Sequence, residues 1–253
     1  MLSTEGTQRT DRKNRWLAGQ LAAVAGFVNA SGFLLIGTFT SHVTGNVGRL
    51  SHDVVLHDAH AAVLALLMVV AFFVGALLAS MAIEAGLLGR RVYAALLLGE
   101  AALLLGFFVV TQLLPATSPR AHDAQALVLC AAMGLQNSLV TRLSGAVVRT
   151  THLTGVVTDL GIEAARWFRY SRARVAQASR LRLTVSPSPV ERPHAPKALL
   201  LLTILACFLL GGFAGAILTV RLGPDALVAP IVGLAVLGVW ALVQRVVAAD
   251  SRA

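Results

Sequence analysis

Long apolar stretches alternate with short polar segments along this chain. Six stretches contain about 20 or more mostly apolar residues, the length that a helix needs to cross a bilayer. They cover residues 16–37, 61–87, 92–114, 124–148, 198–220 and 226–247. Their runs of Leu, Ala and Val lack the alternation of a membrane β-barrel, so helices must satisfy the backbone in lipid. We therefore predict an all-α polytopic membrane bundle of about six transmembrane helices.

Composition supports this prediction. The chain is 57% hydrophobic and 13% charged, and its mean hydropathy is +0.76. A soluble domain has roughly 25% charged residues, so this chain lacks the polar surface that water requires. We expect residues 1–253 to form one membrane domain with the lipid bilayer as its partner.

The positions of Lys and Arg predict the orientation in the membrane. They gather before the first apolar stretch, between the second and third, between the fourth and fifth, and after the sixth, whereas the alternate links hold only Arg49, Arg120 and Arg221. The positive-inside rule then makes both termini cytoplasmic. The net charge of +9 is accounted for by orientation and by contact with anionic lipid headgroups at the cytoplasmic face. Nucleic acid is not an expected partner.

A polar sequence occurs twice in this apolar chain. Thr40-Ser41-His42-Val43-Thr44-Gly45-Asn46 returns as Thr150-Thr151-His152-Leu153-Thr154-Gly155-Val156, 110 residues later. We call residues 40–45 the first polar loop and residues 150–155 the second polar loop. Asn29 and Asn137 precede them at a spacing of 108 residues. This duplication predicts that the chain consists of two related repeats, residues 15–114 and 122–247.

The number of stretches between the loops predicts how the repeats are related. Three stretches separate equivalent points, and an odd number of crossings inverts one repeat relative to the other. Inverted repeats with broken helices are a known design of secondary transporters. If residues 44–59 crossed the membrane, the repeats would instead be parallel. That segment contains Arg49, His52, Asp53, His57 and Asp58, so we expect a short broken helix after each loop.

These motifs resemble a known family. The polar string at 40–46, the segment Met133-Gly134-Leu135-Gln136-Asn137, the string Arg149 to Gly155 and Thr158-Asp159-Leu160-Gly161 are similar to those of the YoaK-like family of bacterial inner-membrane proteins, a domain of unknown function. The resemblance covers about residues 15–247. It implies a multi-pass protein of the bacterial inner membrane and names no substrate.

The polar loops are the expected site of chemistry. A Thr-Gly pair opens each short helix, so we expect Thr44 and Thr154 to cap it and its free amides to favour an anion. The alternative is structural, because hydroxyls also satisfy broken backbone at membrane depth. The candidate solute- or ion-binding residues are Asn29, Thr40, Ser41, His42, Thr44, Gly45 and Asn46 in the first repeat, and Asn137, Arg142, Arg149, Thr150, Thr151, His152, Thr154, Gly155, Thr158 and Asp159 in the second.

Three ionisable residues are candidates for proton coupling. His42 and His152 precede the Thr-Gly pairs, and imidazole exchanges protons near neutral pH; each side chain can instead hold its loop. Glu100 lies inside the third stretch, where a carboxyl must be neutral or paired. Arg142 is a possible partner for it or an anchor for a substrate.

The remaining polar segments predict no chemistry of their own. Histidines and acids gather at residues 42–60, but their spacing does not match a compact metal site, and we expect no metal and no cofactor. Residues 162–183 read as a basic interfacial helix on anionic lipid, and residues 184–197 as a Pro-rich linker. Gly211 and Gly215 allow close helix packing, within the protein or across a possible homodimer.

Three classes of function compete. A transporter of a small, possibly anionic, solute explains the paired loops and the inverted repeats. A non-transporting scaffold or sensor explains the basic helix and leaves the duplicated loops without a role. An intramembrane enzyme needs a nucleophile facing a base, and the adjacent residues Ser41 and His42 do not suit that geometry. We therefore expect a secondary transporter and no enzymatic activity.

Overall fold

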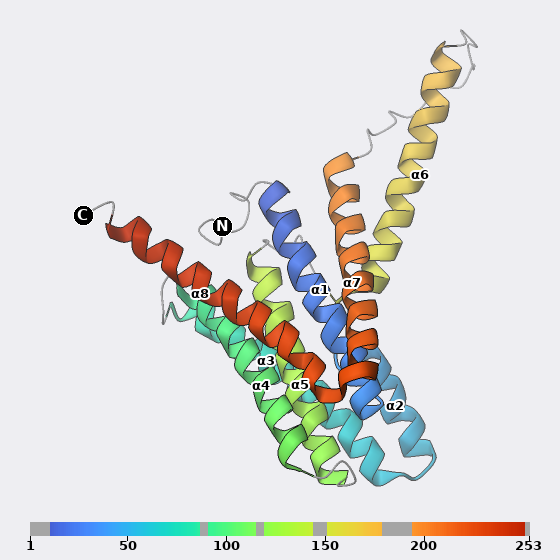
Figure 1. The fold of residues 1–253 in the computed structure, drawn as a ribbon. Helices are drawn as coiled ribbons and strands as arrows, with labels where there is room; N and C mark the ends of the chain where they lie inside the picture. Colours follow the sequence, from blue (N-terminus) through green and yellow to red (C-terminus); the bar gives the residue numbers. More distant parts are fainter. Residues whose placement is uncertain (1–10, 87–90, 115–118, 144–150, 179–193, 251–253) are drawn as a thin grey trace.

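The computed structural model describes residues 11–86, 91–114, 119–143, 151–178 and 194–250, and these are helical apart from short turns. In chain order the elements are α1 (Asp11–Ile36), α2 (Val43–Val55), α3 (Ala59–Glu84), α4 (Val92–Leu113), α5 (Pro119–Leu143), α6 (Leu153–Ala178), α7 (Ala195–Leu222), η3 (Gly223–Leu227) and α8 (Val228–Asp250). Figure 1 shows a bundle in which α1 begins at the same end as α8 finishes. The prediction of an all-α fold is confirmed.

Five segments are long and apolar enough to cross a membrane. They are Arg15–Ile36, Ala59–Glu84, Val92–Leu113, Arg120–Arg142 and Ala195–Val243. The last contains 49 residues, and within it α7 and α8 form a hairpin that turns at η3 (Figure 1). Gly223 has a φ of 59°, a left-handed conformation that glycine adopts without strain, and Pro224 follows it.

The helix bounds match the predicted stretches to within three residues, except that α1 begins at Asp11, five residues before the predicted start at 16, and except at the start of α5. That helix begins at Pro119, five residues before the predicted start at 124. Proline is favoured in the first helical turn, and the polar residues after it continue the helix outside the apolar stretch. The predicted end of this stretch, residues 144–148, lies outside the described residues.

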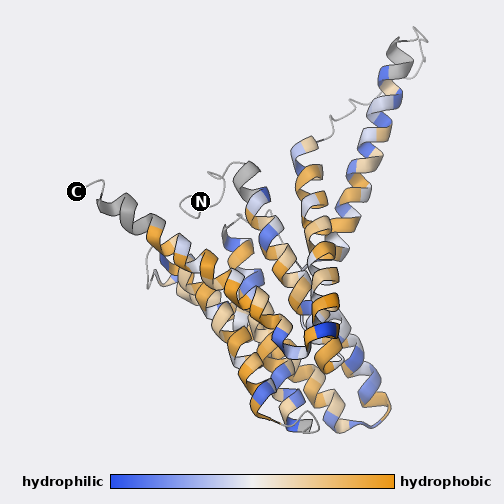
Figure 2. Cartoon of the chain, viewed as in Figure 1, coloured by the Kyte–Doolittle hydropathy of each residue, from blue (hydrophilic) through white to orange (hydrophobic). Residues whose placement is uncertain are grey.

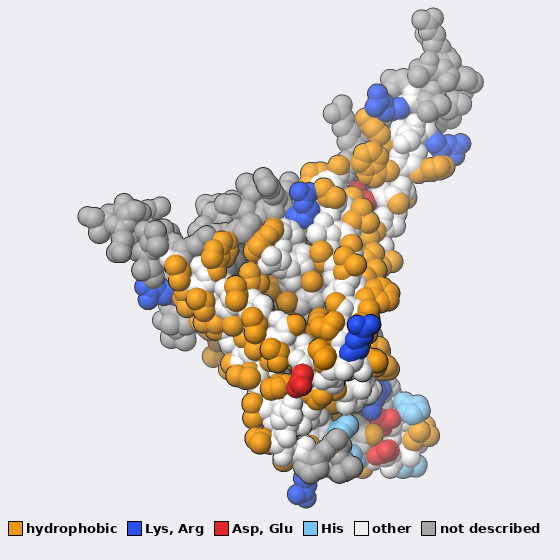
Figure 3. All heavy atoms as spheres, in the orientation of Figure 1, with side chains coloured by type: hydrophobic (Ala, Val, Ile, Leu, Met, Phe, Trp, Pro, Cys, Tyr) orange, Lys and Arg blue, Asp and Glu red, His pale blue; other side chains and the backbone are white. Residues whose placement is uncertain are grey.

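The outer faces of the long helices are apolar. Phe73, Leu78 and Met81 of α3 are 61%, 59% and 56% exposed, and Phe213 of α7 is 66% exposed. Figure 2 shows that hydrophobic residues dominate the long helices of the bundle, and Figure 3 shows hydrophobic side chains spread over its visible face. Soluble proteins rarely expose apolar patches of this extent, so the chain is a membrane protein.

Two helices differ from the membrane-crossing segments. The helix α2 has 13 residues, fewer than the roughly 20 that a span requires, as expected for the broken helix after the first loop. The helix α6 has 26 residues, is not among the five candidate spans, and extends beyond the rest of the bundle (Figure 1). The prediction of a short helix after the second loop is therefore wrong, because α6 continues without interruption through the basic residues at 162–178. Residues 179–183 of the predicted interfacial helix lie outside the described part of the chain.

Two helix pairs are in close contact at glycine residues. In the pair α1–α7, a Cβ atom at Gly26 would lie 2.1 Å from the Phe208 carbonyl oxygen, and one at Gly211 would lie 2.0 Å from the Ala23 oxygen. The pair α3–α5 has the same arrangement. Gly134 faces the Phe72 oxygen and Gly75 the Ala131 oxygen, each at 2.0 Å. Gly211 and Gly215, which packs on Phe27, are thus used within the chain.

These contacts occur at equivalent positions. Gly26 and Gly134, and likewise Ala23 and Ala131, are 108 residues apart, the spacing already seen for the two asparagines. Gly75 and Gly211, and Phe72 and Phe208, are 136 residues apart. The same spacing of 136 relates the N-caps of α3 and α7: Asp58 accepts from the Ala61 amide at 3.0 Å, and His194 Nδ1 accepts from the Lys197 amide at 3.2 Å. The helix pairs α1–α7 and α5–α3 therefore make equivalent contacts, although their sequences differ.

Candidate functional site

The first polar loop is attached to α1 by a side chain. The helix ends at Ile36, and Gly37 leaves it with a φ of 68°. Asn29 lies one and a half to two turns earlier in α1. Its side-chain oxygen accepts hydrogen bonds from the Ser41 hydroxyl at 3.0 Å and from the Ser41 backbone amide at 3.4 Å. Both side chains are buried. The bond fixes the point at which the chain turns back into α2.

The second polar loop is attached to α5 in the same way. Asn137 donates its amide to the Thr151 hydroxyl, and that hydroxyl lies 2.8 Å from the Asn137 carbonyl oxygen. Ser41 and Thr151 occupy equivalent positions in the two loops, 110 residues apart. The repeated asparagines are therefore residues that hold the loops in place.

The structure corrects the prediction that Thr44 and Thr154 cap the short helices. The helix α2 begins at Val43 with His42 at the N-cap, and no side chain caps it. The helix α6 begins at Leu153, directly after His152. Each helix starts two residues earlier than a threonine cap would place it, so each threonine lies inside the first turn and its hydroxyl is free of the capping role.

The helix starts leave backbone donors available. The first helical bonds are from the Asn46 amide to the His42 oxygen at 3.0 Å and from the Val156 amide to the His152 oxygen at 3.1 Å. The three amides before each bond, those of residues 43–45 and 153–155, have no acceptor among the described residues. Such amides are the groups that hold anions at helix starts.

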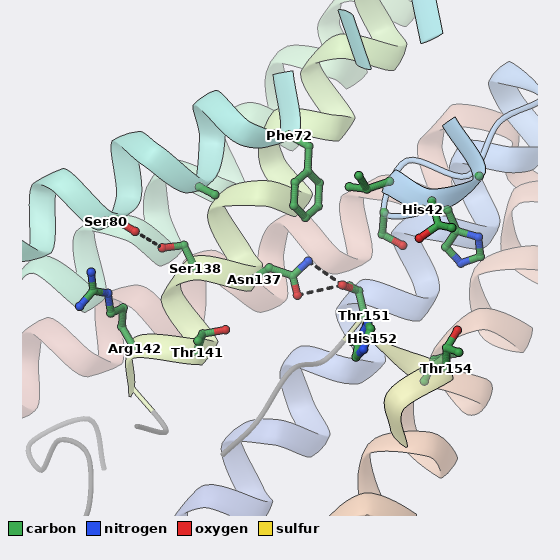
Figure 4. A pocket seen from close by; sticks show the side chains of 16 residues that line it. His42, Phe72, Ser80, Asn137, Ser138, Thr141, Arg142, Thr151, His152 and Thr154 are labelled. Carbon is green, nitrogen blue, oxygen red and sulfur yellow. Dashed lines mark hydrogen bonds between the residues drawn. The ribbon is translucent and has the colours of Figure 1, made fainter. Parts of the chain in front are cut away.

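One pocket is lined by both loops. Its volume is about 760 Å³, within the range of small-molecule sites. Figure 4 shows it between α3, α5 and the beginnings of α2 and α6. The lining residues are Ser41, His42, Val43, Thr44, Gly45, Phe72, Ala76, Ser80, Asn137, Ser138, Thr141, Arg142, Thr151, His152, Leu153 and Thr154. Two segments that are distant in sequence thus share one site.

The charges of the pocket favour a negative ligand. Arg142, His42 and His152 line it, and no Asp or Glu is among the described lining residues. Arg142 forms an ion pair with Glu84 at the end of α3, so it is not the partner of Glu100. Both side chains of this pair are substantially exposed. Glu84 is not among the lining residues, and its carboxylate is bonded to one nitrogen, Nη2, of the Arg142 guanidinium, which has five N–H donors in all.

The two histidines have different surroundings. The ring of His42 lies 5.0 Å from the ring of Phe39, which in turn stacks on Phe33 at 4.4 Å. The ring of His152 lies over Gly155, where an added Cβ would be 2.7 Å from Nε2. At the equivalent Gly45 the nearest atom is the His42 Cβ at 3.6 Å. Gly155 therefore makes room for an imidazole, whereas Gly45 does not need to.

Several residues predicted for the site lie elsewhere. Thr40 and Asn46 are buried but do not line the pocket. Thr158 donates its hydroxyl to the Thr154 carbonyl, and Asp159 pairs with Lys197 of α7 at 3.2 Å. The two last side chains turn away because they lie one turn or more beyond the helix start. Arg149 and Thr150 lie outside the described residues.

The structure also adds residues that the sequence reasoning missed. Ser80, Ser138 and Thr141 bring hydroxyls from α3 and α5 to the pocket, and Ser80 and Ser138 are bonded to each other at 2.8 Å. Hydroxyls in otherwise apolar helices were the available signal. Glu163 is 1% exposed; it pairs with Arg166 within α6 at 2.9 Å and joins α6 to the start of α7 through the His194 amide at 3.4 Å.

Outside the pocket, the histidine-rich segment forms pairs with acids. His52 lies 2.8 Å from Asp53 and His60 lies 3.2 Å from Asp123. In the described part of the chain no three His, Cys, Asp or Glu side chains gather as a metal site would require. Glu100 takes part in neither pair and is not among the lining residues of the pocket; it lies in the middle of α4.

Comparison with known proteins gives a family without a described activity. No curated protein and no solved structure shows significant similarity to this chain. A family model described as "Protein of unknown function (DUF1275)" matches residues 17–240, which include both polar loops and every helix that lines the pocket. The expected membership of an uncharacterised family is confirmed: the chain belongs to the DUF1275 family.

Proposed function

We propose that the protein is a secondary transporter of a small solute with an anionic group, and that the solute binds in the pocket where the two polar loops meet. The observation that carries this proposal is the shared pocket of about 760 Å³. Two copies of one polar sequence, from opposite halves of the chain, contribute equivalent residues to it. A structural role for each loop separately would not require them to share a cavity.

The lining chemistry supports an anionic solute. The starts of α2 and α6, with free amides at the lining residues 43–45, 153 and 154, meet the Arg142 guanidinium and two imidazoles in a cavity whose described lining has no carboxylate. A helix start favours an anion by about 0.3–1 kcal/mol, or up to about 2 kcal/mol when partly buried. Carboxylates and phosphates present the oxygens that these donors bind.

The proposed transport cycle rests on six crossings and inverted repeats. We propose that α1, α3, α4, α5, α7 and α8 each cross the membrane, with both termini in the cytoplasm of a bacterial cell. The equivalent contacts of α1 with α7 and of α5 with α3 support this arrangement, because two inverted halves place their helices in matching pairs. In this orientation the pocket extends from the loops towards the cytoplasmic ends of α3 and α5, where Arg142 pairs with Glu84.

The amphipathic part of α6 suits a place on the cytoplasmic leaflet. Trp167 and Phe168 are 44% and 63% exposed, and Arg172 lies over the Phe168 ring at 5.5 Å. Exposed aromatic and basic side chains on one helix favour contact with anionic headgroups. We propose that this helix fixes the second half at the membrane surface while the solute binds at its start.

The hydrogen bond made by the hydroxyl of Ser41, the residue before His42, favours transport over catalysis. Ser41 donates its hydroxyl to Asn29, and a nucleophile must instead donate to its base. Thr151 is engaged with Asn137 in the equivalent position. The hydroxyls of Ser41 and Thr151 therefore hold the loops, and the proposal includes no enzymatic activity.

The experiment is uptake into proteoliposomes from a panel of radiolabelled carboxylates, phosphates, neutral solutes and cations. A matched pair of variants tests the site: Thr154→Val removes a lining hydroxyl, whereas Thr158→Val removes a hydroxyl one turn further along α6, outside the pocket. Loss of one hydrogen bond to a charged ligand costs about 1.5–3 kcal/mol, or about 10-fold to 100-fold in affinity.

We expect uptake of an anionic solute that Thr154→Val weakens and Thr158→Val leaves unchanged. Absence of uptake for every solute under every ion gradient would contradict the transport proposal. If a thermal-shift screen then still detected an anion that binds and loses affinity in Thr154→Val, the pocket would be a receptor site, as in the sensor alternative.

A further inference from the structure

A carboxyl group lies unpaired in the interior of the bundle. Glu100, in the middle of α4, is completely buried, and both its carboxylate oxygens lack a hydrogen-bond partner among the described residues. Four other side chains have a buried oxygen in the same condition: Thr40 in the first polar loop, Asp53 of α2, and, in the long helices, Gln20 of α1 and Gln136 of α5. We call Gln20, Glu100 and Gln136 the buried polar layer.

Neighbouring contacts place these three residues at a similar depth. Gly99 of α4 faces Leu135 of α5, so Glu100 and Gln136 are each one residue from that contact. Gln136 also donates its side-chain amide to the Leu21 carbonyl of α1 at 3.1 Å, next to Gln20. The layer therefore joins three helices in the core of the bundle.

The unsatisfied atoms of the layer are all acceptors. They are the two oxygens of Glu100 and the amide oxygens of Gln20 and Gln136. A buried polar atom without a partner costs about 1–3 kcal/mol, and more when it is charged. No described group donates to the two Glu100 oxygens, so burial favours the neutral carboxylic acid over the carboxylate, and its O–H is a donor of the kind that amide oxygens accept.

We propose that Glu100 is a proton-binding site that holds one proton within the buried polar layer. A metal ion would fit less well, because ion sites in transporters use the carbonyls of unwound backbone. The helices α1, α4 and α5 run without a break through Gln20, Glu100 and Gln136, so their carbonyls are engaged within the helices.

No described charged group faces the layer from the helices around it. The ionisable residues of α3 and α5 lie near the helix ends, at His60 and Glu84 and at Arg120, His122, Asp123 and Arg142, apart from the thiol Cys130 in the middle of α5. Neither α1 from Trp16 to Ile36 nor α8 from Val228 to Val243 contains an ionisable residue. The element η3 also contacts α4, and its acidic residue Asp225 accepts a hydrogen bond from Gln112 near the end of α4. No described cationic side chain at this depth could therefore pair with the Glu100 carboxylate in place of a proton.

The layer is connected to the solute pocket through α5. Gln136 belongs to the layer, and the next residue, Asn137, lines the pocket and holds the second loop. If a change in the protonation of Glu100 shifts α5, both Gln136 in the layer and Asn137 in the pocket lining move with it. This coupling of proton to solute rests on the proposed function, whereas the proton site itself does not.

Infrared difference spectroscopy tests the proton site without any solute. The wild-type protein in lipid at neutral pH should show the carbonyl stretch of a protonated carboxylic acid, shifted in heavy water. The Glu100→Gln variant should lose this band, since the amide has the shape of the neutral acid. Asp225→Asn, which changes a carboxylate hydrogen-bonded to Gln112 at 2.9 Å, should keep it.

Absence of the band from wild-type protein at neutral pH, or its persistence in Glu100→Gln, would overturn the proposal. So would its removal by sodium ions, which would assign the layer to a metal cation. Because the key spectrum is that of the wild-type protein, the test does not depend on how a variant folds.

Uptake under a pH gradient tests the coupling. We expect the gradient to drive accumulation by the wild-type protein and by Asp225→Asn, and this response to be lost in Glu100→Gln. An infrared band without any uptake would support the proton site and contradict the transport proposal. Uptake that responds to the gradient equally in Glu100→Gln would overturn the role of Glu100.

Discussion

Replacement of Gly134 by alanine should separate α3 from α5 and destabilise the protein. The added methyl group would lie 2.0 Å from the Phe72 carbonyl oxygen and 3.1 Å from the Ala76 nitrogen. These are backbone atoms, so no side-chain rotation relieves the overlap. The helices must move apart by about 1.4 Å to bring the first contact to 3.4 Å, the start of ordinary van der Waals separation.

The expected cost follows from that displacement. A gap of about 0.5–1 Å already removes a quarter to a half of the dispersion energy of a contact, and overpacking in well-packed interiors costs about 1–3 kcal/mol. We expect Gly134→Ala to lower the free energy of unfolding by about 2 kcal/mol, measured by denaturant titration in detergent micelles. Gly26→Ala should have an effect of similar size, because Gly26 lies 2.1 Å from the Phe208 oxygen.

A matched control is available in α4. Gly106 has no atom within 4 Å of an added Cβ, so Gly106→Ala should be neutral or stabilising by up to about 1 kcal/mol through helix propensity. If Gly134→Ala and Gly106→Ala unfold alike, the close approach of α3 to α5 is wrong. If Gly134→Ala destabilises and Gly26→Ala does not, the two helix pairs are not equivalent.

Three further variants address the loops and the pocket. Gly155→Ala should displace the imidazole that lies over it and weaken anion binding about 10-fold, whereas Gly45→Ala, with its nearest contact at 3.6 Å, should bind normally in the same thermal-shift titration; equal losses would contradict the different packing of the two histidines. Asn137→Ala should lower the unfolding free energy by about 1–3 kcal/mol, because two hydrogen bonds to the second loop are lost; unchanged denaturation would show that the loop is held by other contacts. Arg142→Ala should weaken anion binding and Glu84→Ala should strengthen it by freeing the guanidinium, with stability changed by less than about 1 kcal/mol because the pair is exposed; binding curves that shift in the same direction would refute this electrostatic role.

The helices and the repeated loops are the features that the sequence predicts well. Hydrophobic stretches of spanning length are a strong local signal, and each predicted stretch overlaps a helix. The break at the first loop follows from local chemistry too, since a glycine at position 37 and polar residues up to Asn46 interrupt an apolar run, whereas the length of α6 after the second loop was not predicted. The asparagines at 29 and 137 were found through their constant spacing, although their hydrogen bonds to Ser41 and Thr151 were not foreseen.

Features that depend on packing between distant segments were not predictable. The pocket is shared by both loops because α3 and α5 approach at Gly75 and Gly134, and no local pattern encodes that pairing. The partner of Arg142 is Glu84, 58 residues away, rather than Glu100. Asp159 was assigned to the site by its nearness to the second loop in sequence. Its position in the first turns of α6 instead directs it to Lys197.

The central proposal is that two inverted halves share one site that opens to each side of the membrane in turn. Ser138 lines the pocket, and Cys130 and Cys207 are the only cysteines of the chain. With both replaced by alanine and Ser138→Cys introduced, a membrane-impermeant maleimide can be applied to either side of sealed vesicles of known orientation. We predict labelling of residue 138 from both sides. Labelling from one side alone would contradict alternating access to a common site.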